Sequence, residues 1–171
     1  GNLYAKYIDD QNKRCPVWAF LEMISFGQYL YFYKYCVELL QNTEITERLY
    51  LMYTVKSLRN ACAHNNCIIN DINSTHNKRI NADLQRECTK FIKSPSSRRR
   101  HLGHISTYQI LTTMYAHQRI CISTGVHNHI CGELDELKKR FFRDNDYRLN
   151  DNIKATFDVL IRAIDTWFHI R

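Results

Sequence analysis

Residues 43–65 read TEITERLYLMYTVKSLRNACAHN, and this stretch decides the fold that we expect. One apolar stripe at helical spacing consists of Leu51, Val55, Leu58 and Cys62. A second apolar side of the same segment is formed by Leu49, Met52 and Tyr53. A helix that is apolar on two sides is either central in a bundle or shared with a partner subunit. The stretch therefore predicts a long helix from about Thr43 to about Asn65.

The end of this helix combines a cation with a titratable group. Asn60 and His64 are separated by one helical turn, so they lie about 40° apart on one face, and the long side chain of Arg59 can reach the same place. A histidine titrates near pH ~6.5 and can act as acid or base. A guanidinium can hold a phosphate through paired hydrogen bonds and neutralise developing charge. We therefore take Arg59, Asn60 and His64 as candidate catalytic residues for metal-free transfer at phosphorus.

The pattern R-N-x-x-x-H at residues 59–64 resembles the R-polar-x(3–5)-H signature of the HEPN ribonuclease superfamily. A second block makes the resemblance more specific, because the order of both blocks is similar to that of abortive-infection (Abi) proteins. That block contains Pro16-Val17-Trp18, Glu22, Ser25-Phe26-Gly27 and Tyr33. Together the motifs cover about residues 16–66.

The resemblance implies a HEPN-like helical fold and a metal-independent endoribonuclease of an abortive-infection or toxin-type phage-defence system. His64 would take the proton of a ribose 2′-OH, and that oxygen would attack the adjacent phosphorus. Arg59 would hold the phosphate, and Asn60 would orient His64 or the phosphate. One histidine does not easily take and give a proton at once, and HEPN enzymes typically pair two motifs across a homodimer. The expected partners are RNA, a second copy, and an antitoxin RNA or protein.

Two features depart from the Abi pattern. Family members usually carry a longer N-terminal half before the P-x-W block, so we expect this chain to be the C-terminal part of a longer Abi protein. Members also often have a basic residue shortly after the histidine, where this chain has Asn66 and Cys67. The alternative interpretation is therefore a non-catalytic RNA- or protein-binding helical module of a defence system.

Length and composition predict one all-α domain over residues 1–171, an antiparallel bundle of about six helices. The 5 glycines and 2 prolines leave few breaks in the chain. A net charge of +7 favours an acidic partner such as RNA or an anionic surface. The 7 cysteines are odd in number and scattered, which indicates reduced thiols of a cytoplasmic protein rather than a disulfide framework.

The segment from Pro16 to about Leu40 is apolar nearly all round and predicts one buried helix of the bundle. A membrane span is the rival interpretation, but Glu22, Gln28 and Lys34 interrupt the run, so we expect no membrane association. A lone acid in an apolar run needs a partner. Glu22 is accordingly a supporting candidate that orients Arg59 or His64, or else it faces solvent.

Basic residues outside the motif are candidate RNA contacts. A polar loop over residues 66–81 carries Lys78 and Arg79, and Arg98-Arg99-Arg100 follows the breaker Ser-Pro-Ser-Ser. Contacts of this kind are made to phosphates and do not depend on base sequence. The alternative for each is an ordinary solvated side chain.

Two cysteines and two histidines fall between residues 121 and 131. Their spacing, C-x5-H-x-H-x-C, matches no familiar zinc site, and Gly125 and Gly132 predict a turn there. No cluster of carboxylates has metal-ligand spacing either. We therefore expect neither a metal nor another cofactor. The remaining apolar patterns predict helices over residues 105–121, 133–145 and 151–169.

Overall fold

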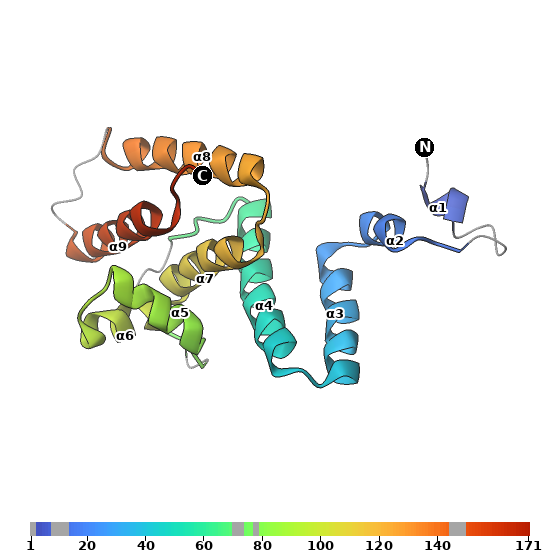
Figure 1. Cartoon of the computed structure of the whole chain (residues 1–171). Helices are drawn as coiled ribbons and strands as arrows, with labels where there is room; N and C mark the ends of the chain where they lie inside the picture. Colours follow the sequence, from blue (N-terminus) through green and yellow to red (C-terminus); the bar gives the residue numbers. More distant parts are fainter. Residues whose placement is uncertain (1–2, 8–13, 70–73, 77–78, 144–149) are drawn as a thin grey trace. The chain divides into compact units, whose positions relative to one another are not determined.

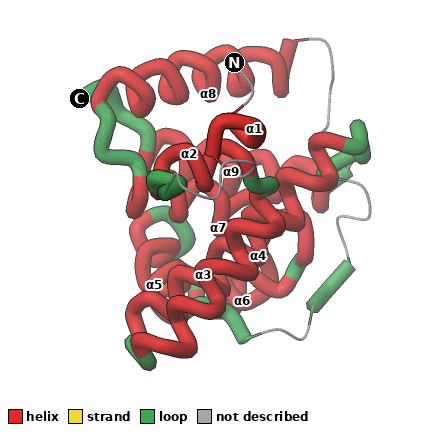
Figure 2. The backbone as a smooth tube through the Cα atoms, turned by 90° about the vertical axis from the view of Figure 1, so that its right-hand side faces the viewer, coloured by secondary structure: helices red, strands yellow, loops and turns green. Residues whose placement is uncertain are grey.

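The computed structural model describes residues 3–7, 14–69, 74–76, 79–143 and 150–171. This part of the chain is helical and holds no strand, which confirms the all-α prediction (Figures 1 and 2). Its only β feature is an isolated bridge between Thr75 and His104. The helices are α1 (Leu3–Tyr7), α2 (Val17–Met23), α3 (Phe26–Leu40), α4 (Thr43–Ala63), α5 (Ala82–Glu87), η1 (Cys88–Lys90), α6 (Pro95–Gly103), α7 (Ile105–Ile120), α8 (Thr124–Arg143) and α9 (Asp151–Trp167).

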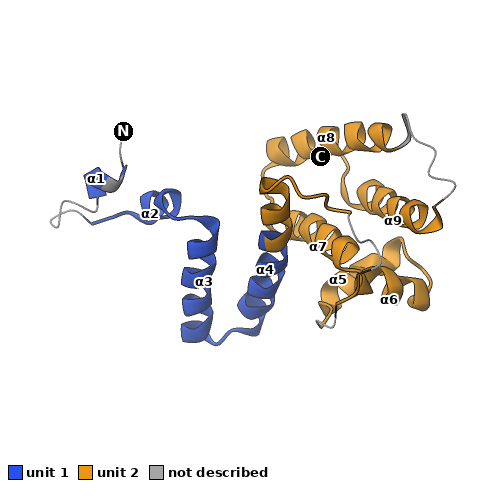
Figure 3. Cartoon of the chain, turned by 180° about the vertical axis from the view of Figure 1, so that it is seen from behind, with its two compact units in different colours: residues 1–56 blue, residues 57–171 orange. Residues whose placement is uncertain are grey.

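The chain divides into two compact units, Gly1–Lys56 and Ser57–Arg171 (Figure 3). Helix α4 passes from the first unit into the second, so the candidate catalytic residues belong to the second. That residues 1–171 form a single HEPN-like domain stays a prediction.

In the first unit, α3 and the beginning of α4 form an antiparallel pair (Figure 1). Leu30 and Val37 of α3 are buried together with Leu49 of α4. The left-handed Gln41, with φ 47°, ends α3. The side chain of Asn42 then accepts hydrogen bonds from the N–H groups of residues 44 and 45, at 2.9 and 3.2 Å, and so caps the start of α4. The predicted helix beginning near Thr43 is confirmed.

The prediction of a single helix from Pro16 to Leu40 is wrong, because the helix is interrupted between the end of α2 at Met23 and the start of α3 at Phe26. Ser25 is extended, with ψ 158°, and forms a capping box with Gln28. Its hydroxyl accepts from the Gln28 N–H at 3.2 Å, and its own N–H donates to Gln28 Oε1 at 2.8 Å. These two bonds satisfy groups that a helix start leaves open, so the break is stable locally.

In the second unit, α7 packs against α6 and α9. Its buried side chains include Tyr108, Leu111 and Tyr115, and α9 contributes Phe157, Leu160 and Trp167. The helices predicted over residues 105–121 and 151–169 are thereby confirmed to within two residues at each end.

The turn predicted at Gly125 and Gly132 is wrong, because both glycines lie inside α8. Helix α8 packs against α9, and Lys138 ties the pair together by its ion pair with Asp165 at 2.7 Å. No helix in the described ranges combines the length and the apolar character that crossing a bilayer requires.

Candidate active site

The candidate site lies at the C-terminal end of α4, and the backbone there holds His64 in a defined place. Asn65 takes the left-handed conformation with φ 52°. Its N–H donates to the Cys62 carbonyl at 3.1 Å, and the Asn66 N–H donates to the Ala61 carbonyl at 2.9 Å. This pair of bonds is a Schellman motif, which ends a helix and satisfies its last carbonyls. Helix α4 therefore ends at Ala63, immediately before His64 and two residues before the predicted end near Asn65.

The side chains of the motif differ in their exposure. Arg59 and His64 are exposed, Asn60 is half-buried, and Leu58 is buried. The buried leucine anchors the last turns of α4 while the exposed imidazole and guanidinium stay accessible to a ligand. A nucleotide could therefore reach His64 without any rearrangement of the second unit.

A hydrogen bond orients the guanidinium of Arg59. Its Nη1 donates to the Asn60 Oδ1 at 3.3 Å. Helical geometry alone places Arg59 and His64 about 140° apart around the axis, whereas Asn60 and His64 share one face. The bond thus turns Arg59 toward the face that carries His64. In this arrangement Asn60 positions Arg59 through its side chain, and its carbonyl accepts the His64 N–H at 3.1 Å.

The structure separates the candidate RNA contacts into different environments. Arg98 is half-buried, and its Nη1 donates to the carbonyls of Ile92 at 2.8 Å and Lys93 at 3.4 Å. Those bonds stabilise the turn between η1 and α6, so Arg98 has a structural role here. Arg79, Arg99 and Arg100 are exposed, and Lys78 lies outside the described residues. RNA contact by these four stays a prediction.

The supporting residue Glu22 is exposed in α2, within the first unit. Its role in orienting Arg59 or His64 in the second unit stays a prediction.

The second apolar side of α4 is covered within the chain. Leu49 is buried, and Met52 and Tyr53 pack against the same cluster with α3. This side therefore does not present a free surface to a partner subunit, and it cannot serve as an argument for a homodimer.

The cysteines and histidines of residues 121–131 do not converge. His127 and Cys131 are buried in α8, whereas His129 of the same helix is exposed. Among the residues that the structure describes, no group of at least three His, Cys, Asp or Glu side chains could hold a metal ion.

The second unit also contains a pocket that the sequence did not reveal. It has a volume of about 530 Å³ and is lined by residues of α5, α7, α8 and α9, of η1 and of the segment after α9. These elements are far apart along the chain, so no motif marks the pocket. The only local signals are the spacing of Tyr115 and Arg119 by one turn and the alternating charges from Asp83 to Lys90.

Comparison with known proteins gives one finding that concerns this site. Residues 2–70 match the protein family described as Abi-like protein. No curated protein and no solved structure matches the chain significantly. The matched residues are less than half of the chain, and they include Arg59, Asn60 and His64. The match supports an assignment of this protein to the Abi-like proteins.

Proposed function

We propose that the protein is a metal-independent endoribonuclease of HEPN type that acts in an abortive-infection system. The observation that carries this proposal is the exposed His64 at the end of α4, one turn from an Asn60 that orients the guanidinium of Arg59. The match of residues 2–70 to Abi-like proteins supports the defence role.

In the proposed reaction, His64 accepts the proton of a ribose 2′-OH. The 2′ oxygen forms a bond to the adjacent phosphorus, and the bond from phosphorus to the 5′ oxygen breaks. The products are a 2′,3′-cyclic phosphate and a 5′-OH, and the leaving 5′ oxygen takes up a proton from a second acid. Arg59 stabilises the negative charge on the pentacoordinate phosphorus, and Asn60 holds Arg59 in place.

Charge supports RNA as the substrate. The chain carries a net charge of +7, and the exposed Arg79, Arg99 and Arg100 belong to the same unit as the motif. Cations of this kind attract the phosphate backbone irrespective of base sequence, and they accelerate encounter at low salt.

A homodimer would supply the second acid as the His64 of the other copy. Exposed apolar side chains of α3, Tyr31, Tyr35 and Leu39, follow one stripe at i, i+4 and i+8 and are a candidate surface for self-association. We expect sedimentation velocity at micromolar concentration to show a dimer, and Tyr35→Glu to shift it toward monomer because a charge is costly in an apolar interface. Sedimentation of the protein as a monomer at micromolar concentration would contradict the proposed dimer.

The chemistry is tested by incubating the full chain with labelled RNA in the presence of EDTA. We expect cleavage products that carry 2′,3′-cyclic phosphate and 5′-OH ends, because the attacking group belongs to the RNA and no metal takes part. RNA that is 2′-O-methylated throughout is the matched control and should stay intact, since it lacks the nucleophile.

Cleavage of the methylated RNA, or loss of all cleavage in EDTA, would contradict the mechanism. Saturable binding of RNA without any cleavage would instead support the non-catalytic module as the function.

A further inference from the structure

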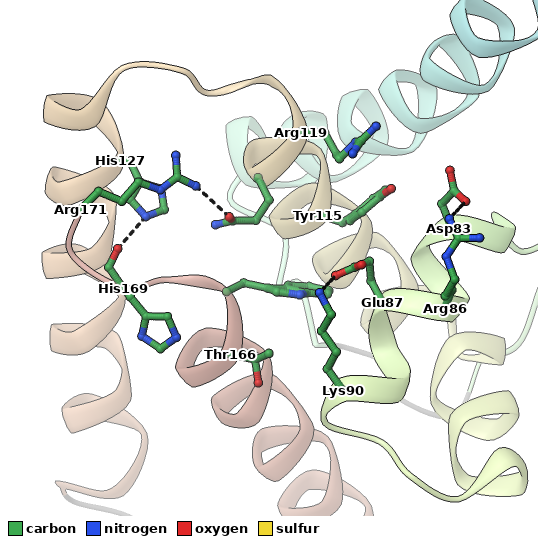
Figure 4. A pocket seen from close by; sticks show the side chains of 12 residues that line it. Asp83, Arg86, Glu87, Lys90, Tyr115, Arg119, His127, Thr166, His169 and Arg171 are labelled. Atoms are coloured by element: carbon green, nitrogen blue, oxygen red, sulfur yellow. Dashed lines mark hydrogen bonds and ion pairs between the residues drawn. The ribbon is translucent and has the colours of Figure 1, made fainter.

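The pocket of the second unit is lined by side chains of α5 and η1, of α7, of α8, and of α9 with the segment that follows it (Figure 4). Tyr115 and Arg119 project from α7, and Glu87 and Lys90 from α5 and η1 on the opposite side. Trp167 is the last residue of α9 and also lines the pocket. The cavity of about 530 Å³ has the size of pockets that hold small organic molecules. None of Arg59, Asn60 and His64 lines it, so the pocket is separate from the candidate active site.

The charges of the pocket leave a positive surplus. Its two acids are each paired with a neighbouring cation, Asp83 with Arg86 and Glu87 with Lys90 at 2.6 Å. Arg119 is exposed and makes no hydrogen bond or ion pair with the described residues. The guanidinium of Arg171 donates to Gln118 Oε1 at 3.2 Å and meets no acid among the described residues. The lining as a whole therefore attracts an anion.

The pocket also has hydrogen-bond donors for which the described ranges of the chain provide no acceptor. Trp167 is only 7% exposed, and its indole Nε1 has no acceptor among the described residues. Gln118 uses its amide oxygen for Arg171, and its buried Nε2 meets no acceptor in the part of the chain that the structure describes. Burial raises the pKa of Tyr115, so its hydroxyl keeps its proton and can donate as well. A buried donor without an acceptor is unfavourable, so these groups favour a ligand that is rich in acceptor oxygens.

The polypeptide that carries Arg171 is held firmly at the pocket. Asn128 of α8 forms a pair of hydrogen bonds with the Arg171 backbone, at 3.0 and 2.9 Å. His127 Nε2 donates to the His169 carbonyl at 2.9 Å, and its ring stacks on Phe168. This clamp places the arginine beside Gln118 before any ligand binds, which lowers the ordering cost of binding.

We infer that this pocket binds a phosphate ester, with the phosphate at the guanidinium of Arg119 and the organic part against the rings of Tyr115 and Trp167, whose centroids lie 6.3 Å apart. A phosphate dianion offers only acceptor oxygens and pairs with guanidinium groups through short, charge-assisted bonds. It therefore matches a lining in which Arg119 and Arg171 meet no acid among the described residues and in which Trp167 and Gln118 have unused donors. The ester is either a free sugar phosphate or the terminal phosphate of an RNA, since both present the same group.

The chain provides its own reporter for a binding test. It has 2 tryptophans, and Trp18 lies in α2 of the first unit with 56% exposure. In a W18F background, Trp167 is the single tryptophan of the chain, and its emission under selective excitation of tryptophan reports on the pocket wall. Ribose 5-phosphate, added at constant ionic strength, should change this emission saturably, whereas ribose should not. Equilibrium dialysis with labelled ribose 5-phosphate measures the same binding without relying on fluorescence.

Arg119→Ala should weaken the binding by about tenfold or more, because a charge-assisted contact is lost. Arg119→Lys should recover part of it. Arg162→Ala is the matched control, since Arg162 is an exposed arginine of α9 that does not line the pocket, and it should leave the affinity unchanged. No binding of ribose 5-phosphate at millimolar concentration by either method would overturn the inference, and so would equal binding by the Arg119→Ala variant.

Short 2′-O-methylated RNAs with a 5′-phosphate or a 5′-hydroxyl separate the two sources of the phosphate. Competition by the phosphorylated RNA alone supports an RNA end as the ligand. If neither RNA competes while ribose 5-phosphate binds, the free ester is the ligand. Because methylated RNA is not a substrate for the proposed cleavage, these results do not depend on whether the protein is a ribonuclease.

Discussion

His64→Ala is expected to lower the rate of RNA cleavage by about 10²- to 10⁴-fold, the usual contribution of a general base. Within the motif, the exposed imidazole of His64 is the group that can accept the proton of the 2′-OH. The substitution removes no buried contact, so the far-UV circular dichroism should not change. Added imidazole should restore part of the activity, because the free base can enter the space of the lost side chain.

Arg59→Ala should lower cleavage by about 10²- to 10³-fold, since it removes a donor that stabilises the transition state. Asn60→Ala should have a smaller effect, because it releases the Arg59 guanidinium from its 3.3 Å hydrogen bond but leaves the charge in place. Arg59→Lys should recover only part of the activity, since an ammonium cannot bind the phosphate through two parallel bonds.

Two exposed residues outside the motif provide matched controls for these variants. His129→Ala in α8 and Arg162→Ala in α9 remove the same chemical groups and should cleave like the native chain. Undiminished cleavage by His64→Ala or by Arg59→Ala would exclude that residue from the catalytic role given to it here.

Acid is expected to destabilise the second unit through His101. This residue is 4% exposed, and burial, with smaller effects from Arg100 and His104, lowers its pKa from 6.5 to about 4. The unfolded chain therefore binds a proton at a higher pH than the folded chain does. The contribution of His101 to the free energy of unfolding is present in full above pH 6.5 and is lost progressively as the pH falls toward 4. The loss amounts to about 3 kcal/mol for this single group. The lowered pKa of His117, caused by burial, His127 and Arg171, adds a change of the same sign.

Urea unfolding of the W18F chain, followed by Trp167 emission at neutral and acidic pH, measures this effect in the second unit. The free energy of unfolding should differ less between neutral and acidic pH in His101→Phe than in the native chain, by about 3 kcal/mol at most. The reason is that a phenyl ring takes up no proton. His129→Gln, at an exposed position, should leave the difference as it is in the native chain. An unchanged pH dependence in His101→Phe would show that the His101 imidazole does not resist protonation in the folded state.

Much of the candidate site was accessible to sequence reasoning because it is local. Helix α4 begins where an Asn side chain caps it and ends where another Asn adopts the left-handed conformation. Both features arise from residues within a few positions of each other, so spacing and residue type suffice to find them. The break at Ser25 was also local, and its S-x-x-Q spacing is a capping-box signal that the apolar composition of residues 16–40 concealed.

The sequence by itself determined the helical class, the bounds of α4, and the gathering of Arg59, Asn60 and His64 at its end, because each depends on neighbours along the chain. Only the tertiary structure decided that α8 runs through Gly125 and Gly132. Gly132 costs about 1 kcal/mol in the interior of α8, whereas Gly125 lies in its first turn. Packing of α8 against α9 offsets the cost. The tertiary structure alone also brought Arg119 of α7 and Trp167 of α9 into the lining of one pocket. Such contacts join residues that are distant in the chain, and no local pattern encodes them.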